Sequence, residues 1–101
     1  MTEPLVFQGP NGSITVTAGA LTRLVTRAAQ GVEGARVRRP KRAVEVTHGD
    51  GRASVAIELS ADFGVPLPEM ARSVQERVAD ALARVSGLEV EAVDVEIEEI
   101  G

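Results

Sequence analysis

The sequence of 101 residues contains no cysteine, tryptophan or tyrosine, and only one histidine and two phenylalanines. Without cysteine the chain can form no disulfide, thiolate nucleophile or cysteine-based zinc site, which indicates a reducing cytoplasm. The single histidine, His48, lies next to a predicted turn where no serine or acidic partner with an orienting pocket can be assigned to it. We therefore expect His48 to be a solvated turn side chain and the protein not to be an enzyme.

Long apolar runs and nucleotide-binding glycine patterns are also missing. No segment approaches the roughly 18 consecutive apolar residues that a membrane span needs, and the N-terminus lacks the pattern of a secretory signal. There is no Walker A motif, and no G-x-G-x-x-G follows a predicted strand. Gly31-x-x-Gly34 matches the loop of a KH domain in letters, but it follows a helical pattern, so we interpret it as a helix end. We predict no cofactor.

The charges are distributed unevenly along the chain. The net charge is −4, yet residues 1–42 carry seven basic and two acidic groups, and residues 43–101 carry four basic and thirteen acidic groups. The basic groups are concentrated between positions 36 and 42, at Arg36, Arg38, Arg39, Lys41 and Arg42. Such a run can contact an acidic protein, anionic lipid or RNA, or it can be neutralised by the glutamate-rich last strand of the same or a neighbouring molecule. We predict these five residues as the partner-binding site.

The acidic groups of the last strand suggest a second candidate, a metal site. Asp94, Glu96 and Glu98 alternate along the chain, at a spacing of roughly 7 Å on one face of a strand. Two such carboxylates hold a hard cation only when a neighbouring element adds further ligands. We therefore predict a solvated acidic face that opposes edge-to-edge aggregation, and no metal site.

Hydrophobic periodicity predicts six elements. Period-two alternation predicts strands near residues 13–17, 44–47, 54–59 and 88–98, and three- and four-residue spacing predicts helices over 17–30 and 69–86. Asp50-Gly51 as a type I′ turn would pair Val46 with Val55 and Val44 with Ile57. Pro40 places the segment before Val44 in a loop or at a sheet edge. A change of phase predicts a bulge near residues 91 and 92.

The order strand, helix, strand, strand, helix, strand predicts an α+β fold. Every strand has one apolar face and both helices have one apolar stripe, so packing both helices on one face of a four-stranded sheet buries all of them. We predict a two-layer sandwich of the ferredoxin-like type over residues 13–101. Residues 1–12, which are rich in proline, glycine and asparagine, are predicted to be a disordered leader.

Five segments carry a family resemblance through their order and spacing: GSITVT at 12–17, GVEGA at 31–35, DFGVP at 62–66, VQERV at 74–78 and GLEVEAVDV at 87–95. In these segments the chain resembles the alkaline shock protein family of Gram-positive bacteria, from about residue 12 to residue 100. The match includes the family's aromatic before Gly64, here Phe63, and a glutamine of the second helix, here Gln75. We expect Phe63 to fill the core edge, Gln75 to bond a loop backbone, and Gly64 and Gly87 to adopt positive φ or end a helix.

The resemblance implies a non-enzymatic cytoplasmic protein of the general or cell-envelope stress response. It further implies self-association, as a homo-oligomer, and a position at the membrane through a membrane-anchored partner rather than through a span of its own. The arginine-rich composition would suit an actinobacterial member. The alternative is a small nucleic-acid-binding protein that uses the basic run of residues 36–42, although no aromatic residue is predicted on the sheet to stack bases.

Overall fold

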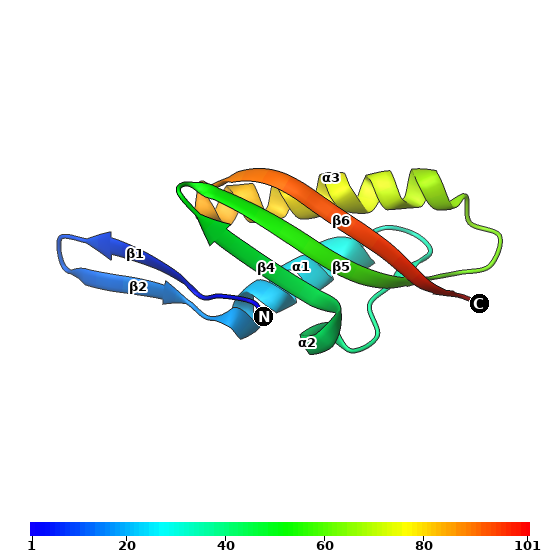
Figure 1. The fold of residues 1–101 in the computed structure, drawn as a ribbon, viewed down its shortest axis with the longest axis horizontal. Helices are drawn as coiled ribbons and strands as arrows, with labels where there is room; N and C mark the ends of the chain where they lie inside the picture. Colours follow the sequence, from blue (N-terminus) through cyan, green and yellow to red (C-terminus); the bar gives the residue numbers. More distant parts are fainter.

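The computed structural model describes all residues, 1–101, as a mixed α+β structure with nine elements (Figure 1). In chain order they are β1 (Leu5–Gly9), β2 (Gly12–Val16), α1 (Ala18–Gln30), β3 (Ala35–Arg36), α2 (Pro40–Ala43), β4 (Val44–Gly49), β5 (Arg52–Ala61), α3 (Leu67–Ser86) and β6 (Glu89–Ile100). The molecule is elongated, with extents of 51 × 22 × 18 Å, and the β1–β2 hairpin projects from one end.

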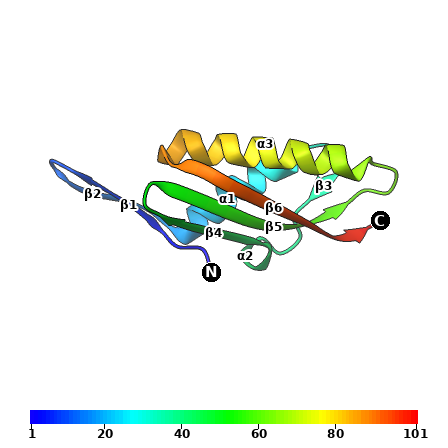
Figure 2. The same cartoon turned by 45° about the horizontal axis from the view of Figure 1, so that its top comes forward.

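The main sheet has four strands and is built around β5. Strand β4 pairs antiparallel with the first part of β5, and the two residues of β3 pair with its last two. Strand β6 pairs with β5 in parallel along its whole length, so it occupies the other side (Figure 2). The parallel pairing follows from the chain order, because α3 connects β5 to β6 as a crossover helix.

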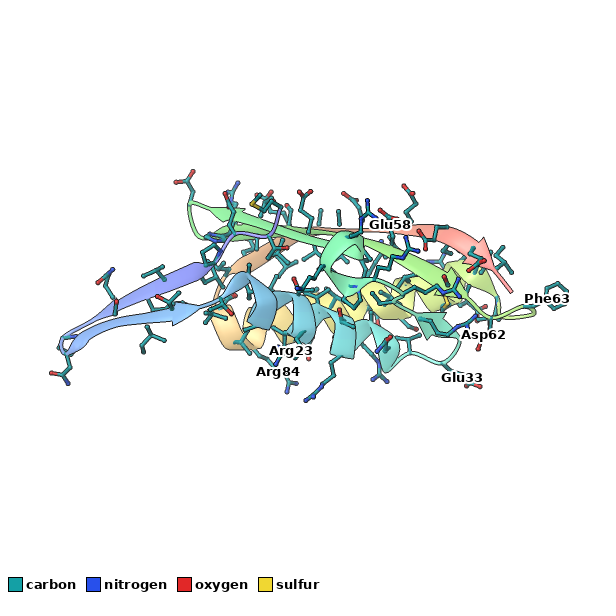
Figure 3. The ribbon with its side chains drawn as sticks, turned by 90° about the horizontal axis from the view of Figure 1, so that it is seen from below. Arg23, Glu33, Glu58, Asp62, Phe63 and Arg84 are labelled. Atoms are coloured by element: carbon teal, nitrogen blue, oxygen red, sulfur yellow. The ribbon has the colours of Figure 1, made fainter.

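Both long helices cover the same face of this sheet, as the sequence predicts (Figure 3). Helix α1 buries Leu21, Val25 and Ala29, which recur every four residues, and α3 buries Met70, Val74, Val78 and Leu82 with the same spacing. These stripes pack against the inner side chains of the strands in one core of 19 buried apolar residues. The predicted two-layer α+β sandwich is therefore confirmed, and its arrangement is ferredoxin-like.

Local sequence signals position the ends of the elements. The Thr17 side chain accepts a hydrogen bond from the Ala20 amide at 3.1 Å and so caps α1. Gly87 ends α3 with a φ of 72°. The β4–β5 turn has φ values of 54° at Asp50 and 77° at Gly51, and its register pairs Val46 with Val55. The predicted type I′ turn is confirmed, because both central residues have positive φ.

The N-terminal region differs from the prediction of a disordered leader over residues 1–12. Residues 5–9 form β1, which pairs antiparallel with β2, the strand predicted at residues 13–17. The hairpin is anchored at its base because Leu5 is 5% exposed and the Glu3 amide donates to the Val46 carbonyl. Consequently β2 lies outside the main sheet, and β3 supplies the fourth strand. In a complete ferredoxin-like sheet the first strand lies between the third and the fourth. Here the strand predicted for that place, β2, is outside the sheet, so β5 and β6 pair with each other directly.

Three further predictions are wrong or incomplete. Phe63 does not fill the core edge, because its side chain is 86% exposed in the loop between β5 and α3 (Figure 3). The segment before Val44 was predicted in a loop or at a sheet edge: residues 35 and 36 do form the edge strand β3, but Pro40–Ala43 form the one-turn helix α2. Strand β6 has the predicted bulge at Glu91 and a second register shift at Glu98 that the side-chain pattern did not indicate. The second shift was missed because Glu98 and Glu99 are both exposed and leave no break in an apolar pattern.

Candidate functional site

The predicted basic run, residues 36–42, spans the end of β3 and helix α2, at the end of the sheet where β3 and the C-terminal end of β6 flank the last two residues of β5. Its first two arginines contact acidic groups and the chain end. The Arg36 Nε lies 3.1 Å from Asp62 Oδ1, and its guanidinium donates to the Gly101 carbonyl at 3.1 Å. Arg38 forms an ion pair with Glu99 on β6. The possibility that this run faces the glutamate-rich last strand of the same molecule is therefore realised for Arg38, whereas Arg36 contacts Asp62 in the loop after β5 and the carbonyl of Gly101.

The other three basic residues belong to helix α2 or to its N-terminal cap. Pro40 occupies the first helical position, where its fixed φ is favourable and its missing amide hydrogen costs nothing. The Arg42 and Ala43 amides both donate to the Arg39 carbonyl at 2.9 Å, which closes the single turn. Arg39, Lys41 and Arg42 form none of the ion pairs of the structure. The run thus divides into two paired and three unpaired cations.

An open depression of about 920 Å³ lies beside these cations on the outer face of the sheet. Its charged lining combines the arginines of the run with carboxylates of β5 and β6: Arg38, Arg39, Arg42, Glu58, Glu98 and Glu99. We call these six residues the mixed-charge basin. It forms beside helix α2, where the exposed carboxylates of Glu58 on β5 and of Glu98 and Glu99 on β6 come together.

The carboxylates of the basin interact with one another. A hydrogen bond shared with Glu98 raises the pKa of Glu58 above its ordinary value of 4.5. Partial desolvation and the negative charges of Glu98 and Glu96 raise this pKa further, whereas the positive charge of Arg42 lowers it. Because Glu58 is exposed, the basin is a region of concentrated surface charge rather than a buried acid.

The chemistry available to this site is charge recognition. No group of three or more His, Cys, Asp or Glu side chains is arranged to hold a metal ion. The Arg36–Asp62 and Arg38–Glu99 pairs are between half and three-fifths exposed, and exposed pairs contribute only about 0–1 kcal/mol. A charged group of a partner can therefore replace one member of either ion pair at little cost in the folding stability of this protein.

Two predicted side-chain roles change in the structure. His48 is not a free turn residue, because its Nε2 lies 2.9 Å from the carbonyl oxygen of Pro4 and ties the N-terminal segment to β4. Gln75 does bond a backbone carbonyl, but it is that of Val93 in strand β6, at 3.0 Å, rather than one in a loop. No local pattern could have indicated the His48 contact, because its partner lies 44 residues away in the chain. Gly64 has the positive φ that was expected, 92°.

Solved structures with the same arrangement support the fold assignment. The MamM CTD D249H variant in its copper form has a TM-score of 0.54 and 18% identity, covering 80% of this chain and 95% of that one. The MamM CTD D249A variant has the same TM-score and coverage at 20% identity. At these identities the likeness concerns the fold alone. A search of curated proteins found no match.

None of the helices is both long enough and apolar enough to span a membrane.

The family comparison concerns most of the chain. The model of the alkaline shock protein 23 family, described as having a cell envelope-related function, matches residues 33–101. This range contains the basic run, the main sheet and α3, and it leaves out the β1–β2 hairpin and α1. The resemblance to alkaline shock proteins is thereby confirmed, and the chain belongs to the alkaline shock protein 23 family.

Proposed function

We propose that this protein is a non-enzymatic component of the cell-envelope stress response that acts by binding other proteins. In this proposal it resides in the cytoplasm and reaches the membrane peripherally, through a membrane-anchored partner, and it also associates with copies of itself as a homo-oligomer. The binding surface is the edge of the sheet formed by residues 36–42 and the mixed-charge basin. Gram-positive bacteria, and actinobacteria in particular, are the proposed source.

The observation that carries the proposal is the division of the basic run. Arg36 and Arg38 are held by groups of the same molecule, whereas Arg39, Lys41 and Arg42 extend from α2 without an ion-pair partner. Family membership supports a cell-envelope context, and three unpaired cations on one turn favour an acidic protein surface as the contact. The Glu-rich outer face of a second copy is such a surface, which is why self-association belongs to the proposal.

The nucleic-acid alternative has less support. Bases need aromatic platforms on the exposed face of a sheet, and here that face carries carboxylates such as Glu58 and Glu96. Phe7 lies in the projecting hairpin, and Phe63 lies in a loop at the far end of the molecule. The acidic outer face would repel a phosphate backbone over most of the sheet.

The test compares wild-type protein with a variant carrying Arg39→Ala, Lys41→Ala and Arg42→Ala. Both tagged proteins are cross-linked in a Gram-positive host, and proteins recovered from the membrane fraction are quantified. Sedimentation velocity at low and high salt measures self-association. We expect the triple variant to lose most of the membrane-fraction partner or of the self-association. Equal recovery and equal sedimentation for both proteins would contradict the proposal.

A further inference from the structure

A groove of about 610 Å³ runs between helices α1 and α2, on the helical side of the molecule. Its α1 wall is formed by Gly19, Thr22, Arg23 and Thr26, and its α2 wall by residues 39–42. The four α1 positions recur at steps of three, one and three residues, so they lie along one stripe of the helix. This stripe is separate from the buried one that faces the core.

The groove combines a carbon-rich surface with one sign of charge. Most of its surface is carbon, from threonine methyl groups, the ring of Pro40 and the stems of the long basic side chains. Four cations border it, Arg23, Arg39, Lys41 and Arg42, and helices α1 and α2 contain no acidic residue. None of the four is in an ion pair. No acidic residue lines the groove, although Arg39 and Arg42 also border the mixed-charge basin on their other side, where the carboxylates of Glu58, Glu98 and Glu99 lie.

We propose that this groove binds a short acidic peptide segment that also carries aliphatic side chains. The inference rests on the proposed function, because it gives the chemistry of the partner that the basic run recognises, and it extends the binding surface onto α1. The four cations supply attraction for carboxylates, and the carbon surface between them supplies a site for an aliphatic side chain.

The molecule contains an internal example of this recognition. The end of β6 has the sequence Glu98-Glu99-Ile100-Gly101, and Arg38 and Arg36 bind its Glu99 carboxylate and its terminal residue. Arg39 and Arg42 border the same Glu98-Glu99 segment in the mixed-charge basin, but their groove side, with Lys41 and Arg23, has no acidic segment beside it. A partner segment of similar composition would complete the pattern.

Other classes of ligand fit the groove less well. A membrane surface is recognised by cations together with protruding apolar side chains, and the large exposed apolar residues all lie elsewhere, at positions 1, 6, 14, 63, 85 and 100. A single-stranded nucleic acid needs aromatic platforms, and the groove has no aromatic residue.

One residue that lines the groove, Thr26, has a buried hydroxyl oxygen without a hydrogen-bond partner. In this proposal a peptide amide donates to this oxygen.

The probe for this proposal is the blocked hexapeptide DLEELD, titrated into the full chain and followed by calorimetry and backbone amide shifts. We expect shifts at Gly19, Thr22 and Thr26, and an affinity that falls when salt is raised from about 50 mM to about 500 mM. The uncharged peptide NLQQLN should not bind, and DSEESD, which lacks the leucines, should bind more weakly. Arg23→Ala should weaken binding of DLEELD by about fivefold or more.

Arg72→Ala is the matched control, because Arg72 is also an exposed helical arginine outside every ion pair but lies on α3. Thr26→Val keeps the size of the side chain and removes the unpaired oxygen, so it should weaken binding without lowering stability. The proposal is overturned if DLEELD does not bind at low salt, if shifts map to the outer sheet face, or if Arg23→Ala and Arg72→Ala behave alike.

Three additional measurements separate the competing occupants and the two proposals. Arg23-dependent binding to phosphatidylglycerol vesicles or to poly(U) that exceeds binding to DLEELD would overturn the peptide assignment. Arg23-dependent self-association without peptide binding would assign the groove to a second copy and overturn it as well. If the Arg39, Lys41 and Arg42 variant loses its membrane-fraction partner while Arg23→Ala keeps it, the groove inference fails and the proposed function stands.

Discussion

The two faces of the main sheet are made by the same strands and have opposite roles. On the inner face Val46, Val55 and Ile57 are at most 2% exposed beneath α1 and α3. On the outer face Glu45, Glu58 and other carboxylates are exposed, and no element covers them. Because side chains alternate along a strand, one segment contributes to both faces. The inner face therefore determines stability, and the outer face determines charge and the contacts available to a partner.

The largest loss of folding stability is expected from shortening a side chain on the inner face. Ile57→Ala removes a side chain that is 2% exposed, and such changes cost about 2–5 kcal/mol because they lose apolar burial and leave a cavity. The control is Ala56→Ser, one position away on the outer face, which should change the free energy of unfolding by less than about 0.5 kcal/mol. The chain has no tryptophan or tyrosine, so urea unfolding is followed by far-ultraviolet circular dichroism. Equal losses would show that the faces are not distinct.

A smaller loss of folding stability is expected from removing a hydrogen bond between α3 and β6. The Gln75 Nε2 donates to the Val93 carbonyl at 3.0 Å across a partly buried contact, so Gln75→Ala should lower the free energy of unfolding by about 1 kcal/mol. Glu76→Ala is the control, since Glu76 is the next residue of the helix and is exposed. If the two variants unfold at the same urea concentration, the hydrogen bond contributes nothing and the helix–strand contact depends on apolar packing alone.

The smallest expected effect is a change in the pH dependence of folding stability, caused by a carboxylate on the outer face. Because Glu98 and Glu96 raise the pKa of Glu58 above 4.5, the unfolded chain gives up this proton more readily than the folded one. The contribution of Glu58 to stability is therefore fully present below pH 4.5 and is lost as pH rises through the raised pKa of the folded state. Glu58→Gln should reduce that loss, measured by thermal unfolding across this range.

The control for the pH experiment is Glu89→Gln, at the start of β6 and away from the carboxylate cluster. It should leave the pH dependence of unfolding close to that of the wild-type protein. If Glu58→Gln has the same pH profile as Glu89→Gln, the carboxylates of β5 and β6 do not interact across the outer face. The contrast between the two faces would then lie in exposure alone and not in charge.

The parts of the fold that sequence reasoning predicted are those encoded by neighbouring residues. The cap at Thr17, the turn at Asp50-Gly51 and the end of α3 at Gly87 each depend on a few adjacent positions. The parts that it missed depend on distant contacts. Strand β1 is stabilised by a connection to β4, and Phe63 is exposed because the loop after β5 turns away from the core. For the candidate site, the sequence indicated the run of residues 36–42, whereas the position of Arg23 beside this run, in the groove between α1 and α2, depends on packing.

The sequence by itself determined which side chains are apolar, the central parts of the two long helices and of strands β4, β5 and β6, and where the basic residues are concentrated. Periodicity and turn chemistry act over short distances, so they can be read from adjacent positions. Only the tertiary structure decided that two arginines of the basic run meet acidic groups more than 25 positions away and that the others border α1. Contacts of that kind depend on how packing brings remote segments together, which no local pattern specifies.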